Sequence, residues 1–349
     1  MVLIKNLSSS PFENARERPT LKKISKDGSL GRARTAELYK MFYSSGPGNG
    51  TMLSLPFDQL VEHGIGHHLN WENSAESEYV IRLANEGCFS AIALSIGQAE
   101  KYQTQIKPDL PLIVKVDGHL SIGDEVSNNR QSMMSSIERA VQAGANAIGF
   151  TFYVGGKDTQ EDMERVSRIV EESHKYGKPT FMWAYARGPL PKKMGEDSLY
   201  WCSQGVSLAE SLGVDVVKQK FPMPLKNTDS HPNIIDAYHG GLAVFSKSMP
   251  NVLQLMELEP EGKECPYDLH VRRASFLGKV APRTLVIVSG GPTSTDPTKV
   301  VNTLEMVMDA GLEGQIVGRN LWGIPIPQAL ELNERLVKVM RKDVYRREW

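Results

Sequence analysis

Eight short apolar segments recur along the chain, and each is followed by residues with the spacing of an amphipathic helix. The apolar segments cover residues 52–57, 91–94, 112–116, 147–152, 180–185, 214–218, 284–288 and 315–317. The helical spacing covers residues 74–87, 96–103, 130–144, 160–177, 198–213, 266–278, 297–311 and 327–341. Several helical segments stop at a glycine, such as Gly144 or Gly213, which tolerates the left-handed conformation that ends a helix. The sequence therefore predicts strands and helices in alternation.

This alternation indicates an α/β fold. Strands that are apolar along most of their length and separated by helices are typical of a parallel sheet buried on both faces. Eight such units predict a (β/α)8 barrel, the TIM barrel. A doubly wound sheet is the weaker alternative, because no G-x-G-x-x-G motif follows the first strand.

Two regions interrupt the regular pattern. Residues 1–48 are polar and end in the breaker cluster SSGPGNG, so we expect an N-terminal extension outside the main fold, with one short helix over 35–43. The barrel domain then covers residues 49–349. An insertion over 222–263 follows the sixth strand, and its composition predicts an irregular flap above the C-terminal mouth of the barrel, with some helix over 233–245.

Composition favours an ordinary globular enzyme of the cytoplasm. The 349 residues are 40% hydrophobic and 23% charged, with a net charge of −1 and no basic block, which argues against nucleic-acid binding. No apolar run approaches the roughly 18 residues of a membrane span, and the N-terminus lacks the pattern of a secretory signal. The three cysteines are far apart and odd in number, which fits a reducing compartment.

The segment VDVVKQKF places two lysines, Lys218 and Lys220, at the end of an apolar strand. A buried ammonium group is costly, so either the lysines extend into water or one of them is present for its chemistry. In barrels the catalytic groups lie at the C-terminal ends of the strands. Burial or a neighbouring cation lowers a lysine pKa from its usual value of about 10.4 and makes the amine nucleophilic. We expect Lys220 to be the neighbouring cation of Lys218.

Other strand ends supply groups for acid–base chemistry. Asp58 follows the first strand, and Tyr185 follows Trp183 by two residues on the fifth, so the two aromatic side chains share a face. Asp58, Tyr185 and one lysine form a possible acid, base and nucleophile set. For Tyr185 and Trp183 the alternative is ordinary core packing. Lys115 on the third strand and Arg187 after the fifth are further candidate site residues.

The histidines near the first strand are weak evidence for a metal site. His63 and the pair His67-His68 have no accompanying carboxylate or second histidine cluster at other strand ends. We interpret them as polar loop residues and predict no metal.

Glycine-rich turns follow the last two strands. Ser289-Gly290-Gly291 and Gly318-Arg319 lie where barrels usually bind phosphate. Glycine lets backbone N–H groups approach an anion, and arginine adds a charged fork. The alternative is that these are tight turns that need a positive φ. Their occurrence on adjacent strands favours phosphate.

Taken in order, these motifs resemble one family. The segments LSLPFDQLVEHG, PLIVKVDG, ANAIGFTFYVGG, MWAYARG, VDVVKQKF, VSGGP and VGRNLWG resemble class I fructose-bisphosphate aldolases of the archaeal and bacterial type, which share a fold with aminodideoxyheptulosonate synthases. The resemblance covers residues 52–328. It implies a homo-oligomeric enzyme without a cofactor that reversibly cleaves fructose 1,6-bisphosphate to dihydroxyacetone phosphate and glyceraldehyde 3-phosphate in glycolysis and gluconeogenesis.

The resemblance also implies residue roles. Lys218 becomes the Schiff-base former, Tyr185 the proton donor and acceptor, and Asp58 an assisting carboxylate, with Trp183 lining the site. The implied phosphate-holding residues are Ser289, Gly290, Gly291, Gly318 and Arg319. Candidates for the second phosphate are Lys115, Arg187 and the insertion, while Lys220 attracts a bisphosphate. The alternatives are a Schiff-base synthase, a transaldolase-like enzyme or a thiolase acting on another phosphorylated sugar or ketone, and a barrel that has lost catalysis.

Overall fold

Eight parallel strands close into a barrel in this computed structural model, which describes residues 30–348 except 63, 71, 121–129, 157, 226–231 and 234–266. The order around the barrel is β1-β10-β9-β8-β7-β6-β3-β2. The barrel strands are β1 (Met52–Phe57), β2 (Ala91–Ser95), β3 (Leu112–Lys115), β6 (Ala147–Val154), β7 (Thr180–Ala186), β8 (Val216–Gln219), β9 (Leu285–Ser289) and β10 (Gly314–Ile316). The predicted (β/α)8 barrel is confirmed, and the ends of the predicted strands differ from the observed ends by two residues at most.

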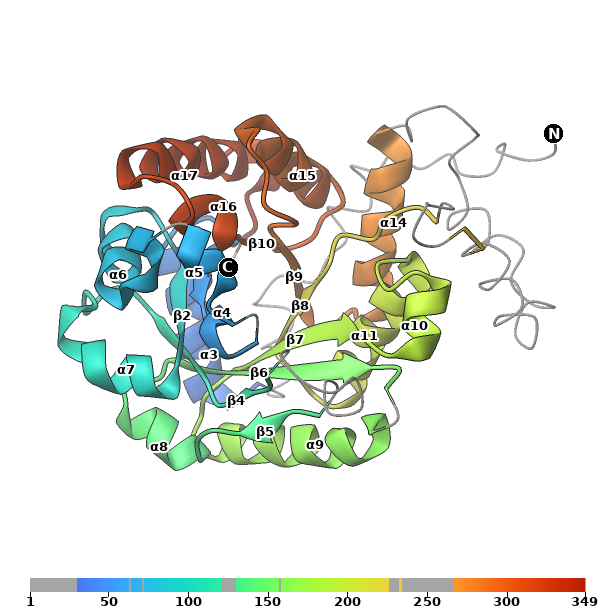
Figure 1. The fold of residues 1–349 in the computed structure, drawn as a ribbon, viewed down its shortest axis with the longest axis horizontal. Helices are drawn as coiled ribbons and strands as arrows, with labels where there is room; N and C mark the ends of the chain where they lie inside the picture. The colour runs from blue at the N-terminus through green and yellow to red at the C-terminus, as the bar shows by residue number, and fades with distance from the viewer. Residues whose placement is uncertain are drawn as a thin grey trace.

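Helices surround the barrel (Figure 1). They are α6 (Ser77–Glu86), α7 (Ile96–Tyr102), α8 (Ile137–Gln142), α9 (Thr159–Lys175), α11 (Leu199–Ser211), α14 (Tyr267–Val280), α15 (Pro297–Asp309) and α17 (Ile326–Met340). Local chemistry explains where α15 begins. The Asp296 carboxylate accepts a hydrogen bond from the Thr298 N–H (2.9 Å) at the start of α15, and Pro297 occupies the first helical position.

One predicted helix is wrong in its first half. The spacing predicts a helix throughout residues 130–144, yet β5 (Ser132–Met133) pairs antiparallel with β4 (Asp117–Gly118), and α8 begins only at Ile137. The Ser136 hydroxyl accepts a hydrogen bond from the Arg139 N–H at 3.2 Å, which caps the helix there. The cap, rather than the apolar spacing, sets this helix start.

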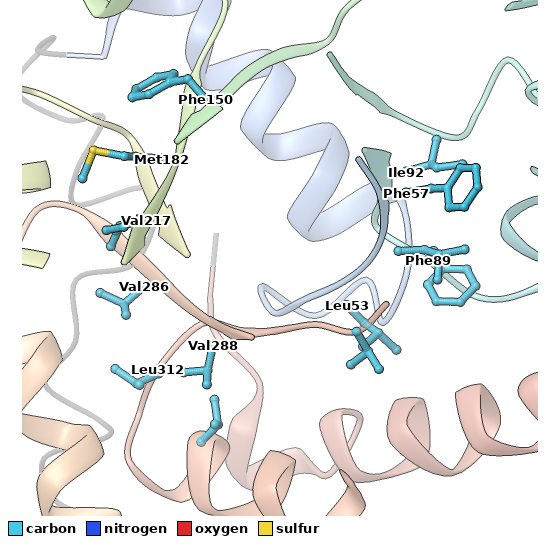
Figure 2. Close-up of a cluster of buried hydrophobic side chains, with 14 of the residues drawn as sticks. Leu53, Phe57, Phe89, Ile92, Phe150, Met182, Val217, Val286, Val288 and Leu312 are labelled. Carbon is cyan, nitrogen blue, oxygen red and sulfur yellow. The ribbon is translucent and has the colours of Figure 1, made fainter. Parts of the chain in front are cut away.

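Alternate residues of each strand face opposite sides of the barrel wall, so one set packs against the helices. Figure 2 shows this outer cluster, which includes Leu53, Phe57, Phe89, Ile92, Phe150, Met182, Val217, Val286, Val288 and Leu312. The other set fills the barrel interior and includes Met52, Ala147, Phe181 and Val216. Burial of both faces explains why the strands read as continuous apolar runs.

The N-terminal segment closes the amino-terminal end of the barrel. Helix α3 (Gly31–Tyr39) continues into a π-helical turn, η1 (Lys40–Ser44), and both lie behind the ring of strands in Figure 1. Leu38, Met41 and Phe42 are buried in one cluster with the first residues of several barrel strands. The prediction that this region lies outside the main fold is therefore wrong for residues 30–48. Its average composition is polar, but these three apolar side chains fill the barrel bottom.

Short helices complete the described fold. Those not predicted from the sequence are α4 (Gln59–Glu62), α5 (Gly66–Asn70), η2 (Glu72–Ala75), η3 (Gln103–Gln105), α10 (Pro189–Met194), α16 (Arg319–Trp322) and η5 (Asp343–Tyr345). The helix expected over 233–245 and most of the expected flap fall outside the described residues. None of the helices in the described part of the chain combines the length and apolar character that crossing a bilayer requires.

Candidate active site

A cavity of about 360 Å³ opens at the carboxyl ends of the strands. It gathers side chains from β1, β7, β8, β9 and β10, which are far apart in the sequence. The predicted site residues that line it are Asp58, Trp183, Tyr185, Arg187, Lys218, Lys220, Ser289, Gly290, Gly291, Gly318 and Arg319. Lys115 is absent from this lining. Every predicted site residue except Lys115 therefore lies in the wall of one cavity.

Lys218 points into the barrel from β8 and is 6% exposed. Its Nζ lies 5.0 Å from the centroid of the Trp183 ring and 5.8 Å from that of the Tyr185 ring. No carboxylate among the described residues lies within ion-pair distance of this amine. Burial lowers the pKa of Lys218 to about 8, and the nearby carboxylate of Asp58 opposes part of that shift. A usable fraction of the amine is therefore neutral near physiological pH.

Two cations, Lys115 and Arg319, also help to lower the pKa of Lys218. The sequence predicts that Lys220 is the cation that lowers this pKa. In the structure, Lys220 Nζ instead lies 2.5 Å from Asp197 Oδ1 at the rim of the cavity. The predicted electrostatic role of Lys220 is therefore wrong. Two residues beyond Lys218, the chain has left the barrel strand, and the ammonium faces a partly exposed carboxylate.

Asp58 is buried in the cavity wall, and Tyr185 is partly buried there. Burial raises the pKa of Asp58, although the ammonium groups of Lys218 and Lys115 act in the opposite direction, and its Oδ1 has no hydrogen-bond partner among the described residues. Burial also raises the pKa of the Tyr185 phenol well above 10, and the Asp58 carboxylate adds to this shift. Tyr185 is thus a neutral hydroxyl beside a carboxyl group that can accept a proton.

Lys115 lies behind the cavity in a buried network of charges. Its Nζ is 2.8 Å from Glu62 Oε1 and 3.0 Å from Asp117 Oδ1, and the lysine is 1% exposed. Despite the opposing effect of burial, the carboxylates of Asp117 and Glu62 raise the pKa of Lys115, so it remains charged. Engaged in this way and absent from the cavity lining, Lys115 is wrongly placed among the phosphate-binding residues.

Glu62 lines the cavity and was not among the predicted site residues. It accepts hydrogen bonds from Lys115 and from the Thr151 hydroxyl (both 2.8 Å). Burial alone would raise its pKa, but these two donors and the Lys115 charge lower it to about 2, so the carboxylate is ionised. Its spacing of four residues from Asp58, across the short α4 turn, is the sequence signal that could have identified it.

Tyr153 is a second residue that the sequence did not single out. It is the register partner of Tyr185 on the neighbouring strand and also lines the cavity. The Arg187 guanidinium carbon lies 5.7 Å from the Tyr153 ring centroid and 5.8 Å from that of Tyr185. The Tyr153 hydroxyl is 3.3 Å from His119 Nδ1. Two tyrosines thus flank one arginine at the side of the cavity formed by β6 and β7.

The loops after β9 and β10 form another part of the wall. The Asn320 side-chain amide joins them, because it donates to the carbonyls of Gly290 (3.0 Å) and Pro292 (3.1 Å) and accepts from the Ser294 N–H (2.8 Å). Gly291 has a φ of +75°, as the tight-turn interpretation requires, and the Gly290 N–H donates a hydrogen bond to the Ile316 carbonyl at 2.9 Å. The glycines therefore shape the turns and, at the same time, keep the cavity wall free of side chains.

The histidines near β1 have different placements. His68 Nδ1 lies 2.9 Å from the Ser74 hydroxyl, and its ring stacks on Trp322 at 5.0 Å between centroids. His63 and the side chain of His67 fall outside the described residues. Within the part of the chain that the structure describes, no cluster of three or more histidine, cysteine or acidic side chains could hold a metal ion.

Comparison with known proteins places this geometry in a family. The model of the DeoC/LacD family aldolases matches residues 52–323, which is most of the chain and all of the barrel strands. The chain belongs to the DeoC/LacD aldolase family. The barrel that the sequence predicted is therefore the barrel of an aldolase.

Named relatives of this aldolase include archaeal and bacterial proteins. A class 1 fructose-bisphosphate aldolase of Thermoproteus tenax is 28% identical over 275 residues, which cover 78% of this chain and 84% of that protein. A fructose-bisphosphate aldolase/6-deoxy-5-ketofructose 1-phosphate synthase of Methanocaldococcus jannaschii is 26% identical over 313 residues, 86% of this chain and 84% of that protein.

Solved structures agree with the fold. An archaeal fructose-1,6-bisphosphate aldolase, with its catalytic lysine covalently bound to the carbinolamine intermediate of the substrate, superposes with a TM-score of 0.66 at 25% identity, over 87% of this chain and all of that one (100%). A fructose-bisphosphate aldolase from Slackia heliotrinireducens gives a TM-score of 0.71 at 17% identity, over 94% of this chain and 93% of that chain, which demonstrates a shared fold.

Proposed function

We propose that this aldolase reversibly cleaves fructose 1,6-bisphosphate to dihydroxyacetone phosphate and glyceraldehyde 3-phosphate through a Schiff base on Lys218, in glycolysis and gluconeogenesis. The position of the Lys218 amine carries the proposal. Lys218 is a buried lysine with a pKa of about 8, whose Nζ lies 5.0 and 5.8 Å from the ring centroids of Trp183 and Tyr185, and it lines a cavity that Asp58 also lines. The relative from Thermoproteus tenax, which is named a class 1 fructose-bisphosphate aldolase, supports this choice of substrate.

The reaction begins at the neutral amine. Lys218 Nζ adds to the ketone carbon C2, and loss of water from the carbinolamine leaves an iminium ion. The iminium accepts the electron pair of the C3–C4 bond as that bond breaks, while the C4 hydroxyl loses its proton and becomes the aldehyde. The resulting enamine takes up a proton at C3, and water then hydrolyses the imine to release dihydroxyacetone phosphate and restore the amine.

Tyr185 is the residue that we assign to the C4 hydroxyl proton. Its raised pKa disfavours a free phenolate, so it accepts this proton as it gives up its own. Asp58, whose pKa burial also raises, is the carboxyl group in the same cavity that can hold the proton until it returns to C3. Glu62 remains ionised beside them and favours the positive charge of the iminium.

The substrate's two phosphates are assigned to opposite sides of Lys218. The loops with Ser289, Gly291 and Arg319 line one side of the cavity and would hold the phosphate on C1. Arg187 and Lys220 also line the cavity and are the cations that we assign to the phosphate on C6. A homo-oligomer in the cytoplasm is part of the same proposal, and light scattering of the purified protein would measure its assembly.

Borohydride trapping tests the proposed mechanism. Reduction in the presence of dihydroxyacetone phosphate should add the mass of one ligand less one oxygen atom, because imine formation loses water and reduction adds two hydrogens. Peptide fragmentation should place the adduct on Lys218. The Lys218→Met variant should neither trap nor cleave fructose 1,6-bisphosphate. Lys220→Met is the matched control, because it removes a lysine of the same cavity and should still trap. An adduct on Lys220 would mean that the two roles are exchanged.

A further inference from the structure

Two carboxylates pair with the cations that the proposed function assigns to the second phosphate of the substrate. Glu196 and Asp197 belong to the connection between α10, which ends at Met194, and α11, which begins at Leu199. Asp197 lines the active-site cavity. A carboxylate in the wall of a cavity that takes a phosphate dianion is unfavourable by simple charge repulsion, so its presence needs a cause.

Each carboxylate holds one of the two cations on this side of the cavity. Lys220 Nζ lies 2.5 Å from Asp197 Oδ1, and Arg187 Nη1 lies 2.9 Å from Glu196 Oε2. The Arg187 Nη1 also donates to the Ala186 carbonyl at 3.0 Å. Two positive and two negative side chains together make this end of the cavity electrically neutral in the structure.

The ion pairs are exposed enough to exchange with a ligand. The side chains are 26% and 42% exposed in the Lys220–Asp197 pair and 29% and 30% exposed in the Arg187–Glu196 pair. Ion pairs in contact with water contribute little to stability, because water solvates the separated charges well. A phosphate dianion carries more charge than either carboxylate and can accept charge-assisted hydrogen bonds from both cations.

The backbone that carries the two carboxylates is fixed. The Met223 N–H donates to the Asp197 carbonyl at 2.8 Å, and the Ser198 N–H donates to the Gly195 carbonyl at 3.0 Å. Ser198 and Met223 also form an isolated parallel β-bridge. These hydrogen bonds join the loop backbone to the segment after β8. The carboxylates therefore leave the cations by rotation of their side chains, without movement of the loop.

We propose that Glu196 and Asp197 are specificity-determining residues, which act as internal counter-anions that the distal phosphate of the substrate must displace from Arg187 and Lys220. The inference rests on the proposed function and specifies how that site selects its ligand. A ligand without a distal phosphate leaves both pairs intact and gains nothing from these cations. A product that retains only the distal phosphate binds against the competition of both carboxylates, which favours its release.

The test compares ligands that differ only at the distal end. Hexitol 1,6-bisphosphate and hexitol 1-phosphate have no ketone, so they bind without forming an imine, and calorimetry gives their Kd. The variants Glu196→Gln and Asp197→Asn remove each charge while keeping the shape of the side chain. We expect each to lower the Kd of the bisphosphate about two- to five-fold, and the double variant about tenfold, with no change for the monophosphate.

Glu164→Gln is the matched control. Glu164 forms an exposed ion pair with Arg168 on α9, at 3.7 Å, and has no contact with the cavity. It should change neither Kd. The differences in the cavity variants should also shrink with added salt, because the competition is between exposed charges.

A higher Kd for the bisphosphate in Asp197→Asn or Glu196→Gln would overturn the proposal, because it would mean that the carboxylates position the cations for phosphate. An unchanged Kd for both ligands would overturn it as well. These binding measurements stand apart from turnover. Failure of the wild-type protein to cleave fructose 1,6-bisphosphate would refute the proposed function, whereas the Kd values of the variants alone decide whether the two carboxylates compete with the distal phosphate.

Discussion

At the scale of single residues, the reactivity that we propose for Lys218 depends on the charges around it as well as on its burial. Burial lowers the pKa of Lys218 to about 8. The carboxylates of Asp58 and Glu62 oppose this shift, and the cations Lys115 and Arg319 add to it. The neutral amine is the reacting form, so its fraction grows as pH rises through about 8 and then levels off. The structure therefore links the pH dependence of imine formation to residues that do not bond to the lysine.

Asp58→Asn tests this link. Removing the carboxylate removes an influence that raises the pKa of Lys218, so the pKa should fall below about 8. The initial rate of borohydride trapping with dihydroxyacetone phosphate, measured over a pH series spanning that value, should then reach half of its plateau at a lower pH than in the wild type. Lys220→Met is the control and should keep the wild-type midpoint. A midpoint that moves upward in Asp58→Asn would contradict this electrostatic account.

Tyr185→Phe tests the assigned acid–base group. The ring remains, so folding and ligand binding should be preserved, while the loss of the hydroxyl should slow C–C cleavage roughly 10²–10⁴-fold, about 3–5 kcal/mol of barrier. The measurements are kcat for fructose 1,6-bisphosphate, the Kd of the hexitol bisphosphate and the melting temperature. Normal turnover with a lowered melting temperature would instead identify Tyr185 as a packing residue.

At the scale of elements, a buried network of charges joins the parts of the fold that carry the site. Glu62 comes from α4, Lys115 from β3 and Asp117 from β4, and Arg165 on α9 reaches Asp117 at 2.7 Å. The Thr151 hydroxyl on β6 donates to Glu62. The network fixes the carboxylate that faces the cavity. It also places a permanent positive charge behind Lys218.

Lys115→Met should destabilise the protein strongly. It leaves the carboxylates of Glu62 and Asp117 buried without their shared cation, and breaking such a buried pair costs about 3–5 kcal/mol. Lys175→Met is the control, since the Lys175–Glu171 pair is mostly exposed and its loss should change the free energy of unfolding far less. Urea unfolding at neutral pH measures both. Similar small losses in the two variants would show that the network does not hold these elements together.

At the scale of the whole molecule, the two ends of the barrel differ: one end contains the cavity, and the other is closed by packed side chains. The carboxyl ends of the strands hold the charged cavity, and the amino ends are closed by α3 and η1. Ion pairs fasten this segment to the barrel, because Arg34 lies 2.8 Å from Asp215 and Glu37 lies 2.6 Å from Lys178. The N-terminal segment therefore belongs to the stability of the domain and lies remote from the chemistry.

Phe42→Ala tests this division. Phe42 is 2% exposed in the barrel-bottom cluster, so its truncation should lower the free energy of unfolding by about 3–5 kcal/mol. The Kd of the hexitol bisphosphate and the pH midpoint of trapping should not change. Tyr176→Ala, at a side chain that is 44% exposed, is the control for loss of an aromatic ring at the surface. A shift in the trapping midpoint would show that the two ends are coupled.

Much of the fold could be predicted from the sequence, because the signals for strands and helices are local. Apolar runs, helical spacing and terminal glycines located all eight barrel strands to within two residues. The rule that barrel sites lie at the C-terminal strand ends then selected Asp58, Tyr185 and Lys218, which the structure brings into one cavity. Glu62 and Tyr153 were not predicted as site residues. The strand-end rule uses the residue types at single strand ends, and it does not use contacts between neighbouring elements.

The partners of charged side chains were decided by the tertiary structure alone. Sequence spacing made Lys220 the neighbouring cation of Lys218, and a strand-end position made Lys115 a candidate for the second phosphate. The folded chain instead pairs Lys220 with Asp197 and Lys115 with Glu62. The strength of a charge–charge interaction depends on distance and burial, and both are set only when segments distant in sequence close into the barrel. The same holds for the three apolar side chains of the N-terminal segment, whose place beneath the strands exists only once the strands have closed.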